Sequence, residues 1–196
     1  MRRVVCAAWL CVLAGAAAAT DYRANAQDYR DYVSRLQPGD RLLLAPGDYL
    51  HGLPLHNLSG RAGQPIVIEA AQAGEPPYFI ARAGANTVSL VDVRYLVLRR
   101  LELDGRNQPV DAVKAEGHSH FADFITLDHL YIHDHAASKQ NVGISTKCPA
   151  FGWVIRRNRI ERVGTGLYLG DADGSDPFVG GVIEANRISQ TLGYNQ

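Results

Sequence analysis

Five of the seven histidines in this chain fall between positions 118 and 135. Two pairs have the pattern His-x-His, namely His118 with His120 and His133 with His135. In extended backbone, residues two apart point to the same side, so each pair would aim both rings at one surface. Imidazole is a general base near neutral pH and a frequent metal ligand. We expect His133 and His135 to be catalytic and His118 and His120 to contact substrate. The alternative is that all four are solvated loop residues.

A second candidate is the acidic segment Asp-Ala-Asp-Gly-Ser-Asp at positions 171–176. Carboxylates alternating around a glycine turn can chelate Ca²⁺ through oxygen ligands. The segment departs from the EF-hand order, which places glycine at the sixth position. The expectation is a calcium site formed by Asp171, Asp173 and Asp176, with no other cofactor. The alternative is a solvated turn held by side-chain-to-backbone hydrogen bonds.

The third candidate is a set of basic residues. Elimination next to a carboxylate needs a base to take the proton and a cation to stabilise the enolate. Lys147 with Arg156 or Arg157 is the best candidate pair in this sequence, and solvated outward faces are the alternative. Tyr168 could stack on a sugar ring as a substrate contact, or pack in the core.

Composition narrows the class of protein that must position these groups. The 196 residues suffice for one domain, and 46% are hydrophobic, which argues against disorder. The 20 basic and 20 acidic residues balance, which argues against a nucleic-acid binder. Cys6 and Cys11 precede the folded part, so Cys148 has no partner for an internal disulfide and is expected to be a buried small hydrophobe.

The N-terminus has the pattern of a secretory signal peptide, assigned to residues 1–19. Arg2 and Arg3 precede an apolar stretch that is short for a membrane span, and small residues offer a cleavage site before Thr20. A second small-residue site allows cleavage as late as Ala26. We expect a secreted or periplasmic protein without a membrane span once the signal is removed; an uncleaved anchor is the alternative.

A repeat of 28 or 29 residues organises the remainder. Four segments share an apolar-x-x-(Leu/Asn)-x-apolar pattern, and they are Leu98–Leu103, Leu127–Ile132, Ile155–Ile160 and Ile183–Ile188. Apolar strands at 42–44 and 66–68 extend the series to about six coils. Shorter segments with period-2 alternation lie between them, at 111–114, 142–145 and 166–169.

Several short strands in each repeat, without a helical pattern between them, predict an all-β fold, a right-handed parallel β-helix over residues 27–196. Asn158 and Asn186 occupy one repeat position and are expected to stack between coils. An amphipathic helix over Gln27–Leu36 is expected to cap the first coil. Because a core strand at 183–188 is followed by no cap, the domain is expected to be incomplete at its C-terminal end.

Two segments carry a family resemblance. Residues 36–49 contain a PGD turn, an apolar strand and a PGDY turn, and residues 64–70 read Gln-Pro-Ile-Val-Ile-Glu-Ala. Together they resemble the start of pectin-lyase-like β-helix proteins, nearest to the alginate-lyase and chondroitinase-B-like group. That group uses a lysine base and an arginine acid, often beside calcium. No segment here matches those catalytic motifs, nor the paired aspartates of polygalacturonases.

The resemblance implies an exported protein that acts on or binds an acidic polysaccharide, with lyase-like β-elimination as the expected reaction. The alternative is a non-catalytic carbohydrate-binding or surface-structural β-helix. In either case the expected partner is a polysaccharide and the expected state is a monomer.

Overall fold

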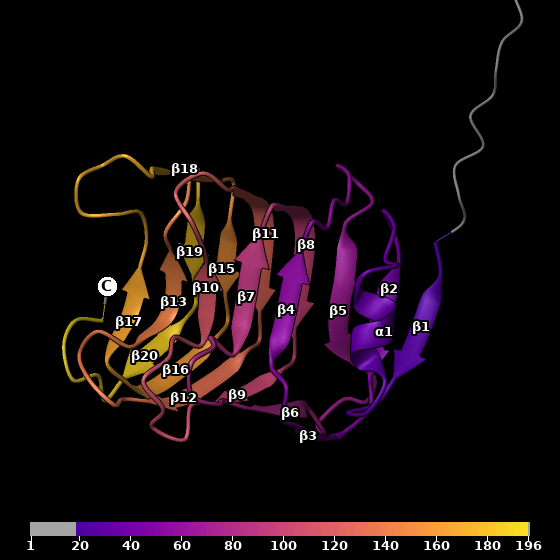
Figure 1. Cartoon of the computed structure of the whole chain (residues 1–196), viewed down its shortest axis with the longest axis horizontal. Coiled ribbons are helices and arrows are strands. Elements are labelled where there is room, and N and C mark those ends of the chain that lie inside the picture. The colour runs from indigo at the N-terminus through magenta and orange to yellow at the C-terminus, as the bar shows by residue number, and fades with distance from the viewer. Residues whose placement is uncertain (1–18, 196) are drawn as a thin grey trace, which may run out of the picture.

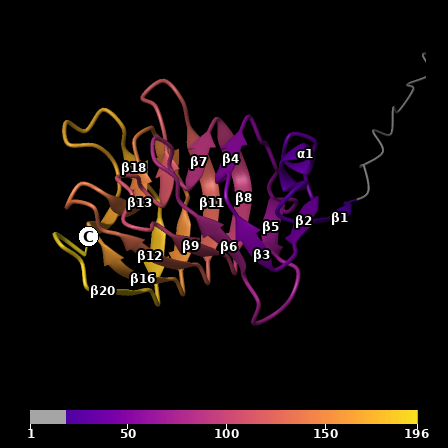
Figure 2. The same cartoon turned by 60° about the horizontal axis from the view of Figure 1, so that its bottom comes forward.

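The computed structural model describes residues 19–195, and all but two of their strands form three parallel sheets along one axis (Figure 1). Successive turns of the chain add one strand to each sheet, which confirms the predicted parallel β-helix of about six coils. Figure 2 brings the sheet that contains β6 (Pro77–Ile80), β9 (Glu102–Asp104) and β12 (Tyr131–His135) to the front, with its strands side by side.

The sheets are named A, B and C, and their strands follow in spatial order. Sheet A consists of β1 (Asp21–Ala24), β2 (Arg41–Leu44), β5 (Ile66–Ala70), β8 (Val93–Arg99), β11 (Ala122–Asp128), β15 (Val154–Arg156) and β19 (Val182–Glu184). Sheet B consists of β3 (Gly47–Tyr49), β6 (Pro77–Ile80), β9 (Glu102–Asp104), β12 (Tyr131–His135), β16 (Arg159–Val163) and β20 (Arg187–Ser189). Sheet C consists of β4 (Leu53–His56), β7 (Val88–Val91), β10 (Val113–Ala115), β13 (Val142–Thr146) and β17 (Thr165–Tyr168).

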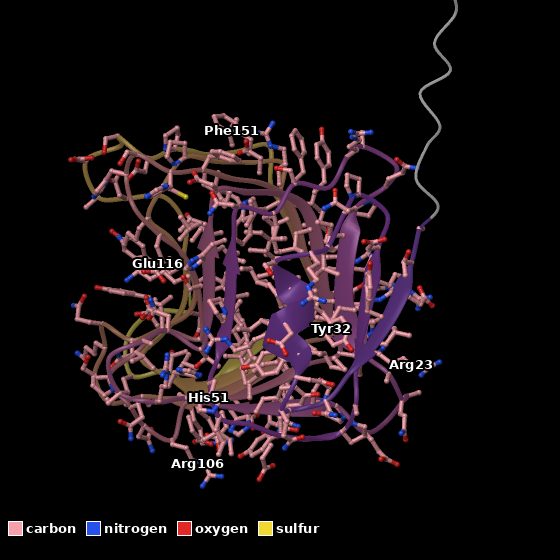
Figure 3. The ribbon with its side chains drawn as sticks, turned by 45° about the vertical axis from the view of Figure 1, so that its right-hand side comes forward. Arg23, Tyr32, His51, Arg106, Glu116 and Phe151 are labelled. Atoms are coloured by element: carbon pink, nitrogen blue, oxygen red, sulfur yellow. The ribbon has the colours of Figure 1, made fainter. Side chains whose placement is uncertain are left out.

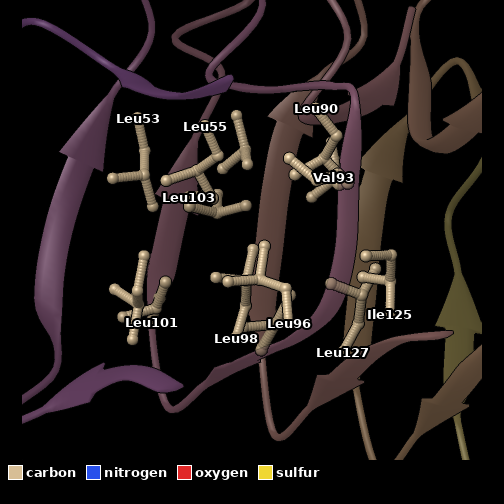
Figure 4. Packing of buried hydrophobic residues seen from close by; sticks show 14 of the residues in the cluster. Leu53, Leu55, Leu90, Val93, Leu96, Leu98, Leu101, Leu103, Ile125 and Leu127 are labelled. Atoms are coloured by element: carbon tan, nitrogen blue, oxygen red, sulfur yellow. The ribbon is translucent and has the colours of Figure 1, made fainter. Parts of the chain in front are cut away.

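Stacked aliphatic side chains fill the space between the sheets. In sheet A the register aligns Ile68, Leu98, Leu127 and Ile155 in one inward row, and all four are fully buried. Figure 4 shows this packing for Leu98 and Leu127 beside Leu96 and Ile125 of the same strands. Burial of each such side chain contributes roughly 1.5–3 kcal/mol to the free energy of folding. The core therefore stabilises the stacking of each coil on the next.

The repeated segment is not a single strand, because it spans the corner between sheets A and B. In the segment at 98–103, β8 ends at Arg99 and β9 begins at Glu102, and Arg100 between them has φ +57°. The equivalent residues His129, Arg157 and Ala185 have φ between +54° and +55°. In these four coils, one left-handed residue therefore turns the chain from sheet A to sheet B.

Asn158 and Asn186 stack at this corner, as predicted. Asn158 Nδ2 donates to Leu127 O and to Asn186 Oδ1, both at 3.0 Å, and Asn158 Oδ1 accepts from Leu130 N at 2.8 Å. Asn186 Nδ2 donates to Ile155 O at 2.8 Å. The ladder satisfies backbone groups that the bend removes from both sheets.

The N-terminal cap is present but shorter than predicted. Helix α1 covers Tyr29–Val33, whereas the residues that flank it form tight turns with i to i+3 bonds, such as Arg35 N to Tyr32 O at 2.9 Å. Tyr29 and Val33 are buried against the first coil. Strand β1 precedes the helix and pairs with β2, so it adds a strand to sheet A that the sequence had not revealed.

A fourth, two-stranded sheet lies beside sheet A, with β14 (Ala150–Phe151) paired to β18 (Phe178–Val179). Left-handed residues Tyr95, Phe124 and Gly152 mark this boundary in three successive coils. The ring centres of Tyr95 and Phe124 lie 4.5 Å apart in a stacked arrangement.

The predicted signal peptide falls almost wholly outside the described part of the chain. Within residues 19–195, no helix has the length and apolar character needed to cross a membrane.

Candidate functional site

The outer side of sheet C carries a row of residues, one from each strand, most of them polar. The register aligns Pro54, Ser89, Lys114, Ser145 and Tyr168 in neighbouring strands. Their sequence neighbours on these strands point into the core, so the row faces outward. Strands lie about 4.8 Å apart, so the row extends for about 19 Å along the axis.

Two residues predicted from sequence meet at one end of this row. Lys147 follows β13, and its Nζ lies 3.7 Å from the centre of the Tyr168 ring. Lys114 is the next cation along the row, and its Nζ lies 3.4 Å from Asp111 Oδ2. Ser145 is buried between them, and its Oγ has no hydrogen-bond partner among the residues described. The structure therefore brings Lys147 and Tyr168 together beside an unsatisfied hydroxyl.

The other end of the row opens into a cavity of about 320 Å³ next to α1. Its basic lining residues are Arg30, His51, His56 and Arg82, and it includes Pro54, Ser89 and Glu116. Within residues 19–195, neither Arg30 nor Arg82 forms an ion pair with a carboxylate. Figure 3 shows His51 and Glu116 on the side of the molecule away from Arg23 of β1. We call this cavity and the row together the sheet C face.

Sequence reasoning missed the cavity, because its residues come from separate turns and have no common spacing. Arg30 lies in α1, His51 and His56 lie just before or within β4, and Arg82 lies in the turn between β6 and β7. The fold brings these three parts of the chain together, and no sequence pattern connects them.

Arg156 lies on sheet A, away from Lys147, and shares no partner with it. Arg156 and Arg157 both bind Asp128, with Nη2–Oδ2 distances of 3.1 and 2.9 Å. Burial alone would raise the pKa of Asp128, but hydrogen bonds from Arg157 and His129, with the charge of Arg156, hold it below the usual range. These arginines therefore serve an ion-pair cluster, and a catalytic role for Arg156 stays a prediction.

His133 and His135 face opposite sides of β12, which corrects the expectation that both rings share a surface. Asp134 between them has φ +58°, so the strand is not regularly extended there. His133 points outward and stacks on Tyr131 at 4.4 Å, with Nδ1 2.6 Å from Asp134 Oδ2. His135 is fully buried, and its Nδ1 lies 3.1 Å from Val110 O. Burial lowers the pKa of His135 to about 4, so the ring is neutral at physiological pH.

Acidic and basic groups around His133 neutralise one another on the outer side of sheet B. The hydrogen bond from Arg162 lowers the pKa of Asp134 to about 2. The hydrogen bond from Tyr131, with those from Arg162 and Arg159, lowers the pKa of Glu161 to about 2. A groove of about 180 Å³, lined in part by Glu102 and Tyr131, adjoins this network.

His118 and His120 lie in the turn after β10 and have different partners. His120 Nδ1 lies 2.9 Å from Asp92 Oδ2. His118 Nδ1 contacts Asp176 Oδ2 and lies 4.0 Å from Asp171 Oδ2. The structure thus places His118 with two of the three predicted calcium ligands.

The third predicted calcium ligand lies beside Asp171 but is not part of that group. Asp173 Oδ1 accepts a hydrogen bond from Ser175 N at 2.9 Å, and Asp173 is not among the three residues that could hold an ion together.

The structure also confirms that Cys148 is buried in the core, where burial raises the pKa of its thiol to about 12.

Comparisons with known proteins support the fold. No protein-family profile and no curated protein match the sequence. An alginate lyase from Paenibacillus sp. str. FPU-7 has a similar structure, with a TM-score of 0.75 and 20% identity over 88% of this chain. The GH136 lacto-N-biosidase from Eubacterium ramulus aligns with a TM-score of 0.58 and 20% identity over 85% of this chain. The chain spans 59% and 41% of the lengths of these two proteins. At this identity they establish a shared fold, the parallel β-helix.

Proposed function

We propose that this is an exported protein that binds an acidic polysaccharide along the sheet C face and cleaves it by β-elimination. The observation that supports this proposal best is the line of cations on that face. Lys147, Lys114 and the cavity arginines follow the solenoid axis, with Tyr168 beneath Lys147. The fold shared with an alginate lyase adds support by analogy.

The face has the properties that a linear polyanion requires. Arg30, Arg82, Lys114 and Lys147 provide four cations, whereas Asp111 and Glu116 provide two carboxylates. A row with one residue per strand runs parallel to the axis, so an extended chain can contact several coils at once. Charge attraction at such a surface favours acidic over neutral polymers and weakens with added salt.

The proposed reaction involves no water. A base takes the proton at C5 of a uronic acid residue, a C4–C5 double bond forms, and the C4–O4 bond breaks while O4 accepts a proton. A cation beside the carboxylate stabilises the enolate that forms at C5. Lys147 is the residue on this face proposed to meet that carboxylate, either as the stabilising cation or as the base.

The test is to incubate the protein with alginate, pectate and chondroitin and to record the ultraviolet absorbance of unsaturated products. Binding is measured in parallel by isothermal titration calorimetry, with a neutral glucan as the control polymer. Products from one acidic polymer, with no binding to the glucan, would support the proposal. Binding without products from any acidic polymer would refute β-elimination and leave the non-catalytic binding protein. Absence of binding would refute the proposal altogether.

Variants locate the site and separate the two roles of Lys147. Arg82→Ala should weaken binding about tenfold or more, if two cations act on one anionic group. Arg23→Ala removes the same charge from the exposed face of β1 in sheet A and should leave binding unchanged. Lys147→Arg keeps the cation but cannot act as a base. Products from Lys147→Arg would assign the lysine to charge stabilisation, whereas binding without products would assign it to proton transfer.

A further inference from the structure

The turn after β17 contains a buried carboxylate atom without a hydrogen bond. Asp176 is 2% exposed, and no donor within residues 19–195 satisfies its Oδ2 in hydrogen-bond geometry. The atom that faces this oxygen is Nδ1 of His118, from the turn after β10. His118 and Asp176 form an ion pair when the ring is protonated. A buried carboxylate needs such a pairing or a metal ion, and an imidazole nitrogen is itself a metal-ligand atom.

Three potential ligand atoms converge there. Asp176 Oδ2, Asp171 Oδ2 and His118 Nδ1 all lie within 4.8 Å of one another. The distance between His118 Nδ1 and Asp171 Oδ2 is 4.0 Å. Ligand atoms around a tetrahedral zinc ion are about 3.4 Å apart, given metal–ligand bonds of about 2.1 Å. Only small movements are needed to reach this geometry, and the exposed ring of His118 can supply them.

We propose that His118, Asp171 and Asp176 bind a divalent first-row transition ion, with Zn²⁺ as the best fit. An imidazole nitrogen together with carboxylate oxygens suits zinc and its neighbours, whereas calcium takes six to eight oxygen ligands. The inclusion of His118 in place of Asp173 therefore changes the class of ion expected at this turn. Water would complete the coordination, because three protein ligands leave a position open.

The rest of the turn is built to hold Asp171 in place. Asp171 Oδ1 accepts from Gly174 N at 3.1 Å and from Asp176 N at 3.2 Å, and Oδ2 accepts from Ser175 Oγ at 3.0 Å. Hydrogen bonds of this kind orient a carboxylate ligand and raise metal affinity. Asp173 interacts with Ser175 and Asp171 but contributes no ligand atom to the group, so it provides a matched control.

The proposed ion would join two turns that are two coils apart, with the β13 coil between them. Strands β10, β13 and β17 are consecutive in sheet C, so the turn after β17 passes the β13 coil to reach His118. It rests on that coil through Gly170 N to Thr146 Oγ1 at 2.7 Å and Ala150 N to Pro177 O at 3.0 Å. In Figure 1 this turn is the gold loop between β17 and β18. Metal binding should therefore order the turn at 170–177.

The test uses the whole protein after treatment with a chelator, titrated with ZnCl₂ and separately with CaCl₂ by isothermal titration calorimetry. We expect one Zn²⁺ per chain and a preference for zinc over calcium. Asp176→Asn and His118→Gln should each weaken zinc binding about tenfold or more. Asp173→Asn and His120→Gln, the controls in the same two turns, should bind zinc as the unmodified protein does. Circular dichroism confirms that each variant is folded.

A second readout follows the structure of the turn. Zinc should slow proteolysis and hydrogen exchange at 170–177 in the unmodified protein and in Asp173→Asn, but not in Asp176→Asn. Absence of saturable zinc binding would overturn the proposal. Equal loss of binding in Asp173→Asn, or calcium binding unaffected by His118→Gln, would overturn it in favour of an all-carboxylate site. The measurements involve no polysaccharide, so their outcome is independent of the proposed function.

Discussion

Replacing Asn158 with alanine tests whether the asparagine ladder stabilises the corners between coils. Asn158 is 2% exposed, and its side chain satisfies two buried backbone groups, Leu127 O at 3.0 Å and Leu130 N at 2.8 Å. Each buried group left without a partner costs about 1–3 kcal/mol. With two groups affected, Asn158→Ala should lower the free energy of unfolding by about 2–6 kcal/mol.

The assay is urea unfolding followed by circular dichroism, with the transition midpoint and slope compared between variants. Asn186→Ala is the matched control, because Asn186 makes the same kind of bond to Ile155 O but is partly exposed. Water can replace part of what Asn186 provides, so its substitution should cost about 1 kcal/mol. A cost below about 0.5 kcal/mol for Asn158→Ala, or an equal cost for both variants, would refute the ladder as the source of stability.

Three further predictions address backbone strain, acid stability and processing. A methyl group at Gly152 would meet Phe124 Cδ1 at 2.6 Å, so Gly152→Ala should lower the melting temperature more than Gly174→Ala, which has similar positive φ but open space around it. The pKa values of Asp134 and Glu161 lie near 2 in the folded protein and near 4 when unfolded, so the stability they contribute is present above about pH 4 and should fall in urea titrations as pH decreases towards 2. Because β1 pairs with β2, cleavage of the predicted signal peptide should leave an N-terminus at residue 20 rather than 27 in mass spectra of the mature protein, and a start at 27 would show that β1 is dispensable.

The repeat register was predictable because it depends on spacing, whereas the corner conformation was not. Apolar residues at Leu98, Leu127 and Ile155 must face one core, and a period of 28 or 29 residues shows this directly. The left-handed residue in each corner is Arg100, His129, Arg157 or Ala185, and these share no side-chain property. Without a glycine or asparagine at that position, the sequence gives no sign that the segment bends.

A left-handed residue also explains why the prediction that His133 and His135 share one surface was wrong. Alternation along a strand holds only where every residue is extended, and Asp134 at φ +58° breaks it between His133 and His135. Lys147 and Tyr168 are neighbours because β13 pairs with β17 in sheet C, which places the end of one strand beside the other. The direction of a side chain that is set by one backbone angle could not be predicted from the sequence. The position of a side chain that is set by the repeat could be predicted.

The balanced composition of the chain conceals how its charges are distributed over the three sheets. On sheet A the register aligns Glu69, Arg99, Asp128, Arg156 and Glu184 in alternating order, so that face is neutralised internally. On sheet B the arginines bind the carboxylates around His133 in the same way. Most carboxylates on those two faces are therefore paired with arginines of the same faces. On the sheet C face, by contrast, the cations outnumber the carboxylates. A net charge of zero therefore excludes a uniformly basic surface but not a local binding site for an anionic polymer.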